Sequence, residues 1–313
     1  MLVCIGEILV DIFKDDKGES VFPGGAPFNV ASNAVNYTKD VYFVGAVGND
    51  DNGRMLIEVA NKKNFVKTDI QVLDDKYTTR AIVTLNNGER DFRFERDGGA
   101  DYNLNINNID FSIIKSGDIV HIGSLMLSYP SGIKFFKALT RQIRQIKGVL
   151  VSFDVNYRDD IFQSQKEAKK IFVNAMRQAD IIKLSEEELY LLSNDKSIES
   201  SLQSLFKPQQ IAVITLGRNG SMLYHDGMIQ KVKSIPVKPV DTTGAGDAFY
   251  SYFLASLLNH PGFVNHKDQV NKYMLRSNIV GAIATLKKGA IGVVPSESQI
   301  DEFLNNQGKH NTY

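Results

Sequence analysis

The residues Asp241-Thr-Thr-Gly-Ala-Gly-Asp247 combine a small flexible loop with a carboxylate at the start of a predicted helix, 246–259. Backbone N–H groups converge at the start of a helix, and the helix dipole favours negative charge there. The loop Gly244, Ala245 and Gly246 therefore predicts an anion site that suits a phosphoryl group. Because a carboxylate repels such a ligand, Asp247 is better explained as a base that takes a proton from an attacking hydroxyl. The alternative is that Asp247 only caps the helix.

A second glycine-rich segment, Pro23-Gly-Gly-Ala-Pro-Phe-Asn29, precedes another predicted helix at 27–38. Paired glycines let the backbone turn sharply and approach a ligand closely. Because proline suits the first turn of a helix, Asn29 would lie in that turn and face whatever Gly25 approaches. The alternative is an ordinary strand-to-helix turn.

Polar and glycine residues also lie at or just after the ends of several predicted strands: Asp11, Arg158, Lys183, and Thr215 with Gly217 and Gly220. The carboxyl ends of strands in open α/β sheets border the ligand crevice, so we expect these residues to line one crevice. Structural alternatives stay open. Asp11 would then be a solvated strand end, and Ser185 with Glu188 would form a helix capping box.

The elements that must position these residues alternate along the chain. We predict strands at 2–10, 41–46, 118–122, 149–154, 180–184 and 211–216, and helices at 27–38, 52–62, 131–147, 165–178, 186–193, 246–259 and 267–286. Several strands are near-continuous apolar runs, as in parallel strands that are covered on both faces. The alternation predicts an α/β fold with a doubly wound, mostly parallel sheet.

Two stretches break this alternation. Residues 12–24 are short, polar and contain glycine, and residues 79–96 indicate a hairpin whose turn is Asn87-Gly88. Both are too short to be a domain alone. Together they predict a small β-sheet that caps the main one.

Composition excludes several classes of protein. The 36 Lys and Arg balance the 36 Asp and Glu, which disfavours a nucleic-acid-binding face. No apolar run reaches the roughly 18 residues of a membrane span. The N-terminus lacks the basic region of a signal peptide, so we expect a cytoplasmic protein.

Cys4 is the single cysteine, which excludes a disulfide within the chain. The five histidines are scattered and show no spacing typical of metal ligands. The P-loop, dinucleotide-loop and protein-kinase signatures are missing.

With these motifs in place, the sequence resembles the ribokinase-like, or PfkB, family of sugar kinases over nearly its whole length. Gly24-Gly25 with Asn29, and Gly45-Ala-Val-Gly48 with Asp50 and Gly53, resemble the family's N-terminal signature. Asp241 to Asp247 resembles its C-terminal signature. Gly-Gly-Ala-Pro-Phe-Asn-Val-Ala, Lys183-x-Ser-Glu-Glu-Glu188, and Arg90 to Arg96 with Ala100-Asp101 are similar to fructokinases.

The resemblance implies one ribokinase-like kinase domain over 1–313, with a small β lid from 12–24 and 79–100. It implies that Asp247 is the base and Gly244, Ala245 and Gly246 the anion hole. Sugar binding would fall to Asp11, Gly25, Asn29, Arg96 and Arg158. ATP binding would fall to Lys183, Glu188, Thr215, Gly217, Gly220 and Asn278.

The resemblance also implies Mg²⁺ with ATP. Glu188 matches the glutamate of the family's Asn-x-x-Glu motif and would act on Mg²⁺ indirectly. Ser185 replaces the asparagine of that motif, which leaves a direct phosphate contact by residue 185 in doubt. A monovalent cation such as K⁺ near Asp241 and Thr243, and a homodimer formed through the lid, stay open.

The function expected is transfer of the γ-phosphoryl group of ATP to a sugar hydroxyl, with fructose 6-phosphate as the product. Kinases for 2-keto-3-deoxygluconate, ribose or a nucleoside are alternatives within the family. A sugar- or nucleotide-binding protein without catalysis is disfavoured because Asp247 is intact. A dinucleotide-dependent dehydrogenase is disfavoured because the required loop after the first strand is missing.

Overall fold

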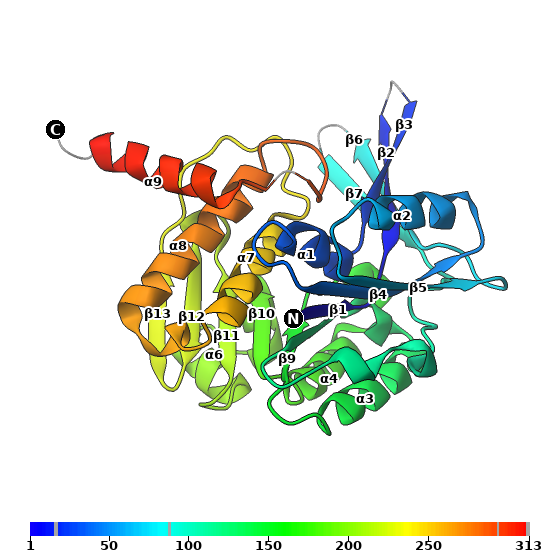
Figure 1. Cartoon of the computed structure of the whole chain (residues 1–313), viewed down its shortest axis with the longest axis horizontal. Coiled ribbons are helices and arrows are strands. Elements are labelled where there is room, and N and C mark those ends of the chain that lie inside the picture. The colour runs from blue at the N-terminus through cyan, green and yellow to red at the C-terminus, as the bar shows by residue number, and fades with distance from the viewer. Residues whose placement is uncertain (16–17, 87–88, 293, 311–313) are drawn as a thin grey trace.

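The computed structural model describes residues 1–15, 18–86, 89–292 and 294–310, and a large twisted sheet runs through its centre (Figure 1). Within these residues sheet A has nine strands. Their spatial order is β13 (Met228–Val232), β12 (Ser221–His225), β11 (Ile211–Thr215), β10 (Ile181–Ser185), β9 (Leu150–Asp154), β8 (Ile119–Ile122), β1 (Leu2–Ile5), β4 (Val41–Gly48) and β5 (Lys67–Leu73). Neighbours are parallel except for the β11–β12 and β12–β13 pairs. The doubly wound, mostly parallel sheet predicted from the sequence is confirmed.

Two hydrophobic cores lie on the two faces of sheet A. Because successive side chains of a strand point to opposite faces, Leu2 and Cys4 of β1 enter one core while Val3 and Ile5 enter the other. Five helices cover the core that contains Leu2 and Cys4: α1 (Ala26–Ala34), α2 (Asp51–Asn61), α7 (Ala245–Asn259), α8 (Lys267–Ala284) and α9 (Glu297–His310). Four helices cover the core that contains Val3 and Ile5: α3 (Pro130–Ile143), α4 (Gln165–Met176), α5 (Glu186–Ser193) and α6 (Ile198–Leu205).

A smaller sheet B stands at one corner of the molecule (Figure 1). Its order is β3 (Gly18–Gly24), β2 (Leu9–Asp15), β6 (Arg80–Asn86) and β7 (Glu89–Glu95). The β2–β6 pair is parallel, whereas β2–β3 and β6–β7 are antiparallel hairpins. The predicted turn Asn87-Gly88 lies outside the described residues.

The single strand predicted at 2–10 is wrong. The chain leaves sheet A after Ile5 and enters sheet B at Leu9, so Asp11 lies within β2 and does not end the first strand. The break falls at Gly6, whose φ of 149° disfavours other residues, and an added Cβ there would lie 2.8 Å from Pro27 Cγ. Sheet B therefore begins three residues earlier than the predicted segment 12–24.

Several elements were not predicted: β5, β12, β13, α6 and α9. These elements are short or lie at the margins of the fold, where polar residues interrupt the apolar pattern. Among the described helices, none is long and apolar enough to cross a membrane.

Candidate active site

The two glycine-rich motifs meet at Asp247, in the first turn of α7. Gly244 is the N-cap residue, with a φ of 72°, and no side-chain hydrogen bond caps this helix. Asp247 is the acidic residue of the first turn, so its charge complements the helix dipole. It also has a partner outside the helix: Asn29 Nδ2 donates a 2.8 Å hydrogen bond to Asp247 Oδ2, although the two residues are 218 positions apart in the sequence.

Close packing at the start of α1 requires glycine at position 25 and brings Gly24 against the Asp11 side chain. An added Cβ on Gly24 would lie 2.3 Å from Asp11 Oδ2, and one on Gly25 would lie 2.4 Å from the Glu7 carbonyl oxygen. Gly25 also has a φ of 105°, and its carbonyl accepts the Asn29 N–H at 2.8 Å. The motif thus brings Asp11 of sheet B close to the helix that carries Asn29.

A buried ion pair lies beside the loop 244–246. Lys183 Nζ, at the end of β10, is 2.7 Å from Asp154 Oδ2 at the end of β9, and both side chains are at least nine-tenths buried. An added Cβ on Gly246 would lie 3.3 Å from Lys183 Nζ. The loop at the start of α7 therefore has an ammonium group next to it, which favours an anion at this point.

The carboxyl groups of the site influence one another. Burial raises the pKa of Asp247 and Asp154 raises it further, while Lys183 and the Asn29 hydrogen bond oppose the shift. Burial, followed by the charge of Asp247, raises the pKa of Asp11 to about 7, and Arg158 opposes this shift. For Lys183, burial would lower the pKa, but the charges of Asp154 and Asp247 raise it overall. Asp247 is thus a carboxyl with the raised pKa that suits a general base.

Four of the six residues predicted to bind ATP, but not Lys183 or Glu188, line a pocket of about 600 Å³ beside the loop. Thr215, Gly217, Gly220 and Asn278 line it together with Ala245 and Gly246. An added Cβ on Gly220, whose φ is 103°, would lie 2.1 Å from the Val232 carbonyl oxygen. The Asn278 side chain donates to the carbonyls of Val232 and Lys233, so it also ties α8 to the segment after β13.

Both carboxylate oxygens of Glu188 are occupied by backbone groups. Oε2 accepts the Ser185 N–H at 2.7 Å within a capping box, and Oε1 accepts the Tyr157 N–H at 2.6 Å. The capping box expected as an alternative is therefore real. No group of three or more His, Cys, Asp or Glu in the described part of the chain could hold a metal ion.

Arg96 follows β7 and is buried against the main body of the protein. Its guanidinium pairs with Asp101 and donates to the Leu125 carbonyl at 3.1 Å and to Ser128 Oγ at 2.7 Å. It lines a second pocket of about 630 Å³, together with Tyr129 and residues of β7. Arg158 is exposed, and its charge acts on both Asp11 and Asp247.

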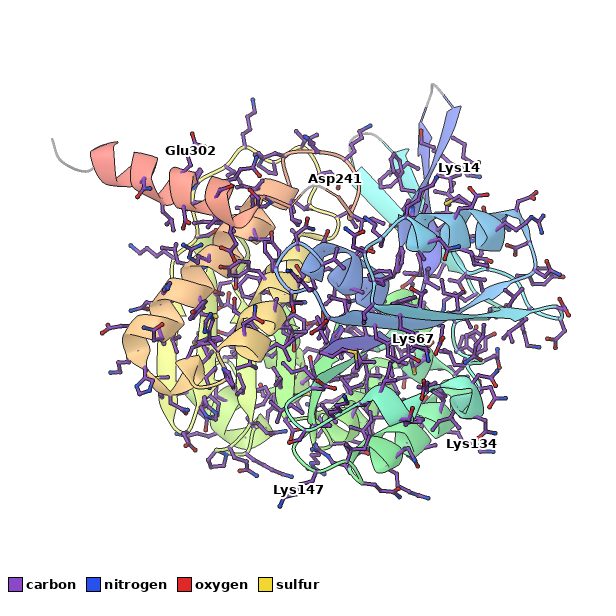
Figure 2. The ribbon with its side chains drawn as sticks, in the orientation of Figure 1. Lys14, Lys67, Lys134, Lys147, Asp241 and Glu302 are labelled. Atoms are coloured by element: carbon purple, nitrogen blue, oxygen red, sulfur yellow. The ribbon has the colours of Figure 1, made fainter. Side chains whose placement is uncertain are left out.

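Asp241 holds two loops together beside the start of α7. Its Oδ1 accepts the Thr243 N–H at 2.9 Å, and its Oδ2 accepts the Gly289 N–H at 3.2 Å. The neighbouring Ala290 packs against Gly244, where an added Cβ would lie 2.5 Å away. Figure 2 shows Asp241 at the same end of the molecule as Lys14 of β2.

Sequence reasoning missed two acidic residues. Asp154 is the last residue of the predicted strand 149–154, in the same strand-end motif that pointed to Arg158, but its pairing with Lys183 depends on the order of the strands. Glu7 falls inside the wrongly predicted strand 2–10. Its side chain is fully buried.

Comparison with known proteins agrees with this fold. The model of the pfkB family carbohydrate kinases matches residues 1–297. A probable fructokinase-2 of Arabidopsis thaliana is 33% identical, over 97% of this chain and 95% of its own length. The fructokinase of Vibrio cholerae O395, solved with fructose, ADP and calcium ion, is 31% identical with a TM-score of 0.86, covering 97% of this chain and 98% of that one. The fructokinase of Xylella fastidiosa with bound ATP is 25% identical with a TM-score of 0.87, covering 98% of both chains. The chain therefore belongs to the pfkB family of carbohydrate kinases.

Proposed function

We propose that this protein is an ATP-dependent fructokinase that transfers the γ-phosphoryl group of ATP to the 6-hydroxyl of fructose. The observation that carries this proposal is the partly exposed Asp247 carboxyl, held by Asn29 beside the Gly246–Lys183 anion site. The relatives named as fructokinases, one of them solved with fructose and ADP, support the choice of sugar.

The sugar enters on the side of Asp11 and Asn29. In this mechanism Asp11, Gly25 and Asn29 bind its hydroxyls, and Arg96 and Arg158 hold the sugar or the transferring phosphoryl group. Asp247 accepts the proton of the attacking hydroxyl as the oxygen bonds to phosphorus. Sheet B acts as the lid and excludes water, which would otherwise compete as the phosphoryl acceptor.

ATP occupies the pocket lined by Thr215, Gly217, Gly220 and Asn278, with its γ-phosphoryl group at Gly244, Ala245 and Gly246. Lys183 offsets the charge that the phosphoryl oxygens bring to this loop. Mg²⁺ bound to the phosphates neutralises part of their charge, and Glu188 supports it indirectly by fixing the backbone at Ser185 and Tyr157.

A monovalent cation such as K⁺ beside Asp241 and Thr243 is part of the proposal. A fructokinase double mutant of Vibrio cholerae O395 was solved with potassium ion, at 31% identity. We also propose that the protein acts in the cytoplasm and that sheet B, with Val21 exposed on β3, forms a homodimer contact. Kinases for ribose, a nucleoside or 2-keto-3-deoxygluconate remain the alternatives, and a non-catalytic binding protein is disfavoured by Asp247.

Turnover of fructose, ribose, glucose and 2-keto-3-deoxygluconate with Mg-ATP, followed by ADP release, tests the proposal. We expect the highest kcat/KM for fructose, and an advantage of about tenfold for another sugar would refute the fructokinase assignment. The variant Asp247→Asn should bind ATP normally and lose about a hundred- to ten-thousand-fold in kcat. Turnover within threefold of the wild type would contradict the role of Asp247.

A further inference from the structure

Glu7 is a fully buried carboxyl group that the mechanism above does not use. It lies between β1 and β2, where the chain passes from sheet A to sheet B. Neither carboxylate oxygen has a hydrogen-bond partner in another described residue, although the backbone N–H of Glu7 itself lies close enough to the carboxyl to lower its pKa. The side chain fills the space left by Gly123, where an added Cβ would lie 2.2 Å from Glu7 Oε2. A buried carboxyl without a partner costs free energy, so its retention calls for a state in which it is paired.

Arg96 offers the complementary group at the other hinge of sheet B. It follows β7, where the chain returns to the main body, and its Nη atoms are engaged by Asp101, Leu125 and Ser128. Its Nε is buried and has no partner within the part of the chain that the structure describes. A free donor and a free acceptor are thus buried at two of the connections that carry the lid.

The charges around Glu7 favour this pairing. The charged groups that act on its carboxyl are Asp101, Arg96 and Asp247, while the packing neighbours Gly25, Pro27 and Gly123 carry no charge. Asp101 and Asp247 repel an ionised Glu7, whereas Arg96 attracts it. An ionised Glu7 therefore gains by moving toward Arg96.

We propose that Glu7 is a positioning residue for sugar binding: when sheet B closes on the sugar, the Glu7 carboxylate accepts the Nε–H of Arg96 and joins the two hinges. The inference rests on the proposed function, in which sheet B is the lid and Arg96 helps to hold the sugar. The carboxylate acts on the sugar only through Arg96, whose orientation it fixes in the closed state.

The proposal couples closure of sheet B to the release of a proton from Glu7. Burial is the main cause that raises the pKa of Glu7 to about 8, so the carboxyl is mostly protonated at pH 7 before closure. Pairing with Arg96 stabilises the ionised form and lowers this pKa, so the proton leaves to solvent when the sugar binds. Because binding releases a proton, the affinity for the sugar rises with pH up to about 8.

The test compares the wild type with Glu7→Gln in the full-length protein. Titration calorimetry with fructose in two buffers of different ionisation enthalpy counts the protons released at pH 7. We expect the wild type to release nearly one proton more than the variant. We also expect a rise of about tenfold in the KM for fructose, as for loss of one charge-assisted hydrogen bond. The KM for ATP should stay within twofold, and the Tm should not fall, because the variant removes an unpaired buried carboxyl.

Asp50→Asn is the matched control, since Asp50, the N-cap residue of α2, is also an acid in contact with a connection of sheet B. Its oxygens are satisfied by Gly53 and Thr78, which precedes β6. This variant should lower the Tm and leave the proton count unchanged. Arg96→Lys keeps the charge but removes the Nε–H, so fructose binding to this variant should release about one proton less than in the wild type, as in Glu7→Gln. This variant gives a second test if the glutamine variant does not fold.

Equal proton counts and equal KM values in the wild type and Glu7→Gln would overturn the inference while leaving the proposed function intact. Wild-type turnover of the sugar panel is measured first and tests the proposed function alone. If another sugar is the better substrate, the calorimetric comparison is made with that sugar.

Discussion

Variants of Lys183 distinguish its contribution to the free energy of unfolding from its contribution to phosphoryl transfer. The Lys183–Asp154 pair joins β10 to β9 at 2.7 Å, and the side chains are 9% and 2% exposed. Asp154 Oδ1 has no hydrogen-bond partner among the described residues, so Lys183 is the counter-charge that the structure gives this carboxylate. In Lys183→Met, an unpaired buried carboxylate remains, and breaking a buried pair in this way costs about 3–5 kcal/mol of unfolding free energy.

The double variant Lys183→Met/Asp154→Leu should recover most of this loss. Replacing a whole buried ion pair by apolar residues of similar volume is often neutral or stabilising. Turnover should not recover, because the ammonium beside Gly246 is absent in both variants. We expect kcat to fall about 10²–10³-fold in each, as when one stabilising group of an anion site is lost.

Urea unfolding followed by circular dichroism measures stability, since the chain has no tryptophan to report by fluorescence. ADP release at saturating fructose measures turnover. In Lys183→Met the lower limb of the pH–rate profile should also move to higher pH, because Lys183 lowers the pKa of Asp247. A loss of less than about 1 kcal/mol in the single variant, or restored turnover in the double variant, would refute this reasoning.

Three further variants probe other parts of the site. Gly246→Val should lower kcat more than it raises the KM for fructose, because its Cβ would lie 3.3 Å from Lys183 Nζ; a normal kcat with a raised fructose KM would assign the loop to the sugar. Arg96→Ala should raise the KM for fructose or the rate of wasteful ATP hydrolysis and leave the KM for ATP unchanged, which initial-rate kinetics with both substrates decides. In the wild type the raised pKa of Asp11, about 7, means that stability is lost as pH rises from about 4 through 7. Asp11→Asn should therefore gain about 2–4 kcal/mol relative to the wild type between pH 4 and pH 8, and parallel unfolding curves at all pH values would contradict this.

The sequence predicts the sheet and the main residues of the site because both depend on local patterns. Apolar strands followed by helices reveal the doubly wound fold, and the loop before Asp247 has the residues that an anion site needs. Of the residues predicted to share one crevice, Thr215, Gly217 and Gly220 line a pocket with this loop, whereas Asp11, Arg158 and Lys183 are not among the lining residues of that pocket.

What could not be predicted depends on contacts between distant segments. The split of 2–10 into two strands is set by Gly6, whose neighbours Pro27 and Gly123 come from two other elements. Asp154 and Lys183 pair because β9 and β10 are adjacent in the sheet, which no local pattern specifies. The hydrogen bonds that Arg96 donates to Leu125 and Ser128 likewise depend on the packing of distant segments.

The packing of α1 against α7 has a consequence for synthesis of the protein (Figure 1). Every residue of α1 is buried, and α7, which helps to cover it, begins only at Ala245. A ribosome that adds about 5–20 residues per second leaves the apolar surface of α1 without this cover for roughly 10–45 seconds after α1 is made. During that time the nascent chain has Asn29 but no Asp247, so it is both inactive and prone to aggregation. A chain that terminates before α7 would expose the same surface permanently, which makes such a fragment a substrate for chaperones and proteases.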